Sequence, residues 1–94
     1  MPNFLICYDV RAKNHDYKTL YACLNQWKAA HLQNSVWLAT LKGPASAVRD
    51  ILEGHLHKDD TVAVVQMPSD GRPSDWATKN DRFAGVSWLR AHYG

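Results

Sequence analysis

The run NFLICYDV, residues 3–10, constrains the fold of this chain more than any other stretch. It is apolar nearly throughout and ends close to a carboxylate, Asp9. A run of this length and composition predicts a β-strand that is buried on both faces. Because alternate side chains of a strand point to opposite sides, Phe4, Ile6 and Tyr8 should share one face and Asp9 should lie on the other.

Asp9 has two interpretations at this stage. An acid at the end of a buried strand is costly unless it is solvated, hydrogen-bonded or bound to a cation. In the simpler interpretation Asp9 meets water at the end of the strand or caps the next loop. In the functional interpretation it binds a cation. Arg11, Lys13 and His15 follow Asp9 closely in the sequence.

The rest of the chain alternates between helical and extended patterns. Apolar residues recur at helical spacing in residues 17–27 and again in residues 48–56. Between these helices, residues 29–33 and 36–41 predict a β-hairpin, and residues 61–67 predict a further buried strand.

This order predicts an α+β fold of the ferredoxin-like βαββαβ type, with a four-stranded antiparallel sheet and both helices on one face. Residues 1–67 would form that core. Residues 68–94 would form a C-terminal extension with a short edge strand at 76–78 and a final helix over 83–93. The extension belongs either to the same domain or to a dimer interface.

A sheet covered by helices on one face leaves the other face open, and this small chain has four tryptophans to bury. The C-terminal extension, a second copy of the chain, or both would cover that face. An open apolar face of this size is typical of an interface, so we expect a homodimer. The tryptophans are then more readily core or interface anchors than platforms for nucleic-acid bases.

Composition excludes some classes of protein and leaves others open. A formal net charge of +2 neither indicates nor excludes a nucleic-acid binder. No apolar run approaches the roughly 20 residues of a membrane span, and no secretory signal is expected. Cys7 and Cys23 occupy apolar positions without metal-ligand spacing, which predicts reduced thiols in a cytoplasmic protein. His55 and His57 are interpreted as a solvated helix end rather than a metal site.

Several motifs in order resemble the small subunit of CRISPR adaptation, the Cas-two family. LICYDV is similar to its first strand, LQNSVW at 32–37 to its hairpin, and DDTVAVVQM at 59–67 to its last core strand. The SinR-like relatives show a similar pattern, and the VapD toxins share the fold and dimer plan. The matching SinR-like positions are Asp16, Tyr17, Leu20, Tyr21, Ser35, Val36, Trp37, Val48, Arg49 and Asp50.

The resemblance implies a homodimer joined through the sheet and two possible functions. The first is a metal-dependent endonuclease of a defence or toxin-type system, acting on RNA or double-stranded DNA. In such an enzyme Asp9 would be the catalytic residue and the Mg²⁺ ligand, with Arg11, Lys13 and His15 binding nucleic acid. The second is a non-catalytic dimeric scaffold that binds nucleic acid or a protein partner. The resemblance stops at residue 67, and the loop after Asp9 lacks the family's usual serine.

Overall fold

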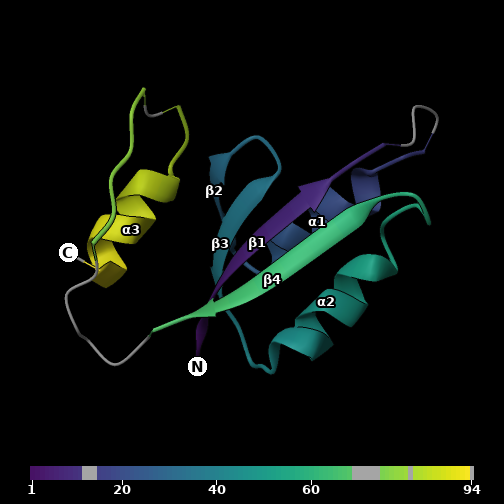
Figure 1. Cartoon of the computed structure of the whole chain (residues 1–94), viewed down its shortest axis with the longest axis horizontal. Helices are drawn as coiled ribbons and strands as arrows, with labels where there is room; N and C mark the ends of the chain where they lie inside the picture. The colour runs from purple at the N-terminus through teal and green to yellow at the C-terminus, as the bar shows by residue number, and fades with distance from the viewer. Residues whose placement is uncertain (12–14, 69–74, 81, 94) are drawn as a thin grey trace.

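The computed structural model describes residues 1–11, 15–68, 75–80 and 82–93, and these form an α+β fold with a four-stranded antiparallel sheet and three helices (Figure 1). Each helix has nine residues, and none in the described part of the chain is long and apolar enough to cross a membrane. The elements are β1 (Asn3–Asp9), α1 (Lys18–Gln26), β2 (Ala30–Gln33), β3 (Val36–Thr40), α2 (Ala45–Glu53), β4 (Thr61–Met67) and α3 (Gly85–Tyr93).

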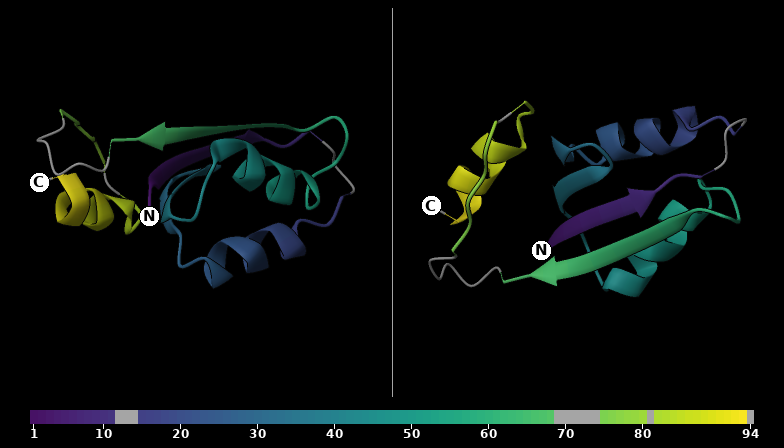
Figure 2. Two further views of the ribbon diagram at one scale, coloured as in Figure 1. Left: turned by 90° about the horizontal axis from the view of Figure 1, so that it is seen from below. Right: turned by 45° about the horizontal axis from the view of Figure 1, so that its top comes forward.

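The sheet is built around β1, which pairs with β3 on one side and β4 on the other in the order β2-β3-β1-β4. Helices α1 and α2 both pack against one face of this sheet, as Figure 2 shows. The predicted sequence of elements from the first strand to the last core strand is therefore observed. The central place of β1 agrees with a run that is apolar on both faces.

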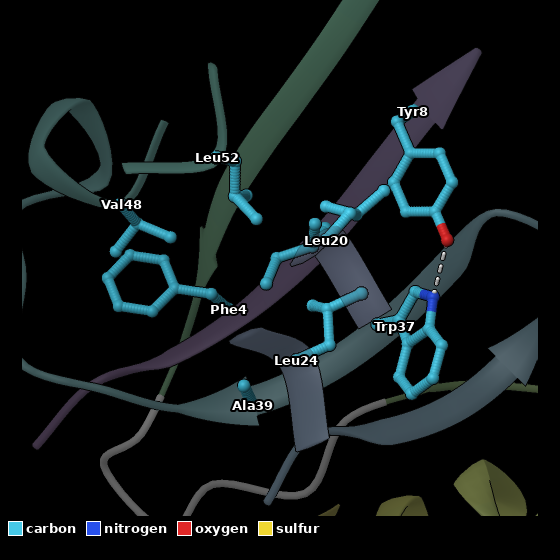
Figure 3. Packing of buried hydrophobic residues seen from close by; sticks show 9 residues of the cluster. Phe4, Tyr8, Leu20, Leu24, Trp37, Ala39, Val48 and Leu52 are labelled. Carbon is cyan, nitrogen blue, oxygen red and sulfur yellow. Dashed lines mark hydrogen bonds between the residues drawn. The ribbon is translucent and has the colours of Figure 1, made fainter. Parts of the chain in front are cut away.

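Three β1 side chains, Phe4, Ile6 and Tyr8, form the centre of the main core. Leu20 and Leu24 from α1 and the apolar residues of α2 cover them (Figure 3). The indole Nε1–H of Trp37 donates a hydrogen bond of 2.9 Å to the Tyr8 hydroxyl, a bond also drawn in Figure 3. Desolvation by burial raises the pKa of Tyr8 to about 12, so this phenol stays protonated at neutral pH.

The C-terminal extension differs from the prediction in one respect. Residues 76–78 are not a strand, so the predicted edge strand is wrong. The final helix is present as α3. It contacts β2 and β3 and lies at a distance from α1 and α2 (Figure 2). Leu38 lies between two core-facing residues of β3 and must point to the opposite face, yet it is fully buried. Helix α3 therefore covers the β2–β3 half of the face that α1 and α2 leave open.

Two contacts fix α3 in that position. The ring of His31 in β2 is stacked between Trp37 and Phe83, with centroid distances of 4.2 and 4.0 Å. At the other end of the helix, the Asn3 amide donates to the Tyr93 hydroxyl at 3.0 Å, and that hydroxyl donates to the Pro68 carbonyl oxygen. The helix is thus attached at both ends to the sheet or to the segment leaving it.

Gly85 allows the close approach of α3 to β2 and provides a test of it. A Cβ atom at this position would lie 2.6 Å from Leu32 Cα and 2.7 Å from the His31 carbonyl oxygen. Because both atoms belong to the backbone, Gly85→Ala should lower the free energy of unfolding by about 2 kcal/mol despite the better helix propensity of alanine. Urea unfolding followed by circular dichroism measures the change.

Gly54→Ala is the matched control for this experiment. Gly54 has an ordinary right-handed φ of −63°, and a Cβ there would meet only the Ile51 carbonyl oxygen at 3.4 Å. This variant should be neutral or more stable by up to about 1 kcal/mol. Equal stability of the two variants would contradict the close packing of α3 on β2.

Candidate functional site

The candidate site lies where β1 ends and β4 begins. Asp9 is the last residue of β1 and pairs with Thr61, the first residue of β4. Its side chain is 59% exposed, and Oδ2 forms an ion pair of 2.9 Å with the guanidinium of Arg11. Asp9 is therefore solvated and paired, and it does not carry the cost of a buried charge.

Asp60 organises the loops beside Asp9. Its Oδ1 accepts the backbone N–H of Arg11 at 2.7 Å. Its Oδ2 accepts the Tyr17 hydroxyl at 2.7 Å and the backbone N–H of His57 at 2.8 Å. One carboxylate thus connects the segment after β1, the start of α1 and the loop before β4. Hydrogen bonds to a charged acceptor are the stronger kind, so Asp60 sets the position of Arg11 relative to Asp9.

Two histidine rings, those of His15 and His57, lie in contact near Asp60, which accepts the backbone N–H of His57. His15 contacts Tyr17 and His57 edge to face, with ring centroids 4.8 and 5.8 Å apart. His57 Nδ1 accepts the backbone N–H of Asp59 at 3.1 Å and lies 3.5 Å from its carboxylate. His57 is therefore held by its neighbours in the loop.

The sequence-predicted site residues are only partly brought together. Arg11, expected to contact a phosphate beside Asp9, forms an ion pair with Asp9 itself. The ring contacts of His15 are with Tyr17 and His57. Lys13 lies outside the described residues.

The role of Asp60 was not predicted from the sequence. It stands immediately before β4, and β4 pairs antiparallel with β1, so Asp60 comes next to the segment that leaves β1. A search for acids that directly precede a strand could have identified it, but only once the pairing of β1 with β4 was known. In the sequence it appears simply as part of a charged connection.

The carboxylates of a single chain do not form a complete metal site in the described residues, where no group of three or more His, Cys, Asp or Glu side chains could hold a metal ion. Both Asp60 oxygens already accept hydrogen bonds. Asp9 offers hard oxygen ligands with high exposure, which suits Mg²⁺, but one carboxylate with an arginine beside it is an incomplete set.

Asp9 also lies on the sheet face that α1 and α2 leave open. It alternates with the core-facing residues of β1, as do Leu5 and Cys7, and the partners of these two on β4 are Val65 and Ala63. We call Leu5, Cys7, Ala63 and Val65 the β1–β4 strip. Val65 is 51% exposed, and burial raises the pKa of the Cys7 thiol. The strip is therefore an apolar surface that leads to Asp9.

Replacement of Asp60 tests whether it organises the loops. Asp60→Asn keeps the shape but removes the charge and exchanges one acceptor oxygen for a donor, so it should cost about 2 kcal/mol in unfolding free energy. Asp59→Asn makes the same change of charge at a side chain that is 66% exposed, and should stay within about 0.5 kcal/mol of the parent. Urea unfolding measures both, and an unaffected Asp60→Asn would contradict the assignment.

Comparison with known proteins found no matching family model, no matching curated protein and no matching solved structure.

Proposed function

We propose that this chain is a Cas-two-like, homodimeric, nucleic-acid-associated protein with a ferredoxin-like core. The proposal is supported by the order of the elements and by two helices on one face of an antiparallel sheet. The three segments with the family resemblance correspond to the end of β1, the β2–β3 hairpin and β4. These are neighbouring parts of one sheet, as a shared fold requires.

The observation that carries the homodimer is the partial exposure of the β1–β4 strip, in which Ala63 and Val65 are exposed while Leu5 and Cys7 are half-buried. Helix α3 covers the β2–β3 half of this face, and the part of the extension that the structure describes leaves Val65 of the strip 51% exposed. A two-fold axis through the strip would pair identical apolar surfaces and remove them from water. Asp9 lies on the same face at the end of β1. A two-fold axis near that end would therefore also bring two Asp9 carboxylates toward each other.

Two Asp9 carboxylates, one from each copy, would provide the ligands for Mg²⁺. The fit in one chain is partial, because Arg11 is paired with Asp9 and Asp60 is engaged by its hydrogen bonds. The phosphates of a nucleic acid would compete for Arg11 and release Asp9. Bound Mg²⁺ would polarise a phosphoryl oxygen and lower the pKa of an attacking water. The proposed activity is metal-dependent hydrolysis of a phosphodiester in RNA or double-stranded DNA.

A non-catalytic dimeric scaffold is the second candidate, and the Asp9–Arg11 ion pair favours it. In this case the pair would neutralise the end of β1 and leave Arg11 to exchange Asp9 for a phosphate. The protein would then bind nucleic acid, or a protein partner of a defence or mobile-element system, without cleaving it. Both candidates use the same surface and differ in whether Asp9 binds a metal ion.

A charge placed in the β1–β4 strip should dissociate the dimer. In Val65→Asp the new carboxylate would remain solvated in a single chain but would be buried in a dimer joined through the strip. Ile51→Asp is the control, because Ile51 on α2 is also 51% exposed. Sedimentation at micromolar concentration should give twice 10.7 kDa for the parent and for Ile51→Asp, and 10.7 kDa for Val65→Asp. A monomeric parent would refute the dimer.

Cleavage assays on RNA and double-stranded DNA with Mg²⁺, Mn²⁺ or EDTA separate the two candidates. Asp9→Asn should reduce metal-dependent cleavage at least about a hundredfold and leave the dimer intact, because a metal ligand is lost at an exposed position. Asp50→Asn on α2 is the control and should cleave like the parent. Cleavage that survives Asp9→Asn and EDTA would contradict the assigned site. Salt-dependent binding without cleavage by the parent would identify the scaffold instead.

A further inference from the structure

A second candidate site lies at the β2 edge of the sheet, between the β2–β3 hairpin and the segment that leads into α3. It is a pocket of about 390 Å³, a size typical of small-molecule sites. We call it the hairpin–tail pocket. Its lining residues are Leu32, Gln33, Asn34, Thr78, Lys79, Asn80, Arg82, Phe83 and Val86.

The charges in the hairpin–tail pocket favour an anion. Lys79 and Arg82 both line it, and no carboxylate is among its described lining residues. Neither cation forms an ion pair within the part of the chain that the structure describes, which does not include Asp81. Arginine in particular presents a planar fork of donors that matches the oxygens of a phosphate.

The first turn of α3 adds to this preference. Its opening hydrogen bonds run from the N–H groups of Ser87 and Trp88 to the Ala84 carbonyl oxygen. The N–H groups of Gly85 and Val86 precede them and have no partner within the helix, as at the start of any helix. Val86 itself lines the pocket, so the positive end of the helix dipole lies beside the two cations.

The remaining lining residues suit a flat organic group with a polar edge. Three carboxamides, Gln33, Asn34 and Asn80, can each donate and accept hydrogen bonds. Two apolar residues, Leu32 and Phe83, supply a surface against which a ring can pack. Carboxamides that pair with the edge of a ring, apolar contacts with its face, and cations for an attached anion together match a nucleotide.

We infer that the hairpin–tail pocket binds a nucleoside monophosphate unit, either free or as the terminal nucleotide of a strand. Lys79 and Arg82 hold the phosphate, the carboxamides contact the base edge, and Leu32 and Phe83 contact the base or sugar. The site uses neither Asp9 nor a metal ion, so it is independent of the proposed nuclease or scaffold activity.

Titration calorimetry on the full chain, in EDTA and at low salt, tests this inference. The ligands are AMP and UMP, the matching nucleosides, inorganic phosphate, and a short 5′-phosphorylated oligonucleotide with its unphosphorylated counterpart. We expect saturable binding of at least one monophosphate, at least ten times tighter than its nucleoside and than phosphate alone. Tighter binding of the 5′-phosphorylated oligonucleotide than of the free monophosphates would identify a strand end as the source, and the reverse order a free nucleotide.

Variants locate the binding. Lys79→Gln and Arg82→Gln remove exposed charges, so the fold should persist, as circular dichroism can verify. Each should weaken monophosphate binding at least fivefold and leave the weak binding of the nucleoside unchanged. Arg49→Gln is the control, since Arg49 is an exposed arginine of α2 outside the pocket, and it should bind like the parent.

Asp9→Asn separates this site from the proposed function. It should bind the monophosphate as the parent does, even if it has lost cleavage. Absence of saturable binding at millimolar nucleotide, equal affinity for nucleotide and phosphate, or undiminished binding by both pocket variants would each overturn the inference. None of these outcomes would alter the cleavage result at Asp9.

Discussion

The hydrogen bonding of β1 on both of its edges is the constraint on which the rest of the structure depends. A strand paired on both sides must be apolar on at least one face, and Phe4, Ile6 and Tyr8 supply that face. Its pairing also places the other loops, since the Tyr8 N–H donates to the Ser35 carbonyl oxygen in the hairpin turn. Asp9 sits at the candidate site because β1 ends there.

The main elements could be predicted from the sequence because each has a local signal. The period of apolar residues identified both core helices, and the uncharged run at residues 61–67 identified β4. The strand expected at 76–78 was wrong because nothing local shows which surface the extension will meet. That surface is set by the burial of Leu38 and by the absence of a side chain at Gly85, and both depend on tertiary contact. The homodimer stays a prediction.

The candidate site, too, has one part that the sequence predicts and another that depends on tertiary contacts. The nearness of Arg11 to Asp9 could be predicted from the sequence, because residues two apart at the end of a strand stay close whatever the fold, but their ion pair was not predicted. Asp60 was not, since it lies 49 residues from Arg11 in the chain and meets it only through the pairing of β1 with β4. The hairpin–tail pocket could not be predicted from the sequence. Lys79 and Arg82 line a pocket with residues of the hairpin only when α3 packs on the hairpin.

The two edge strands of the sheet, β2 and β4, differ in how well they are protected from pairing with another strand. The backbone of β2 is approached by Gly85 and flanked by the His31–Phe83 stack, which hinders another strand from adding there. At the opposite edge, β4 has the sequence TVAVVQM, which contains no charge, proline or glycine. Such a strand is a template for cross-β aggregation when it is left uncovered. A partner that covers β4 and the adjacent strip would therefore also protect the chain from aggregation at high concentration.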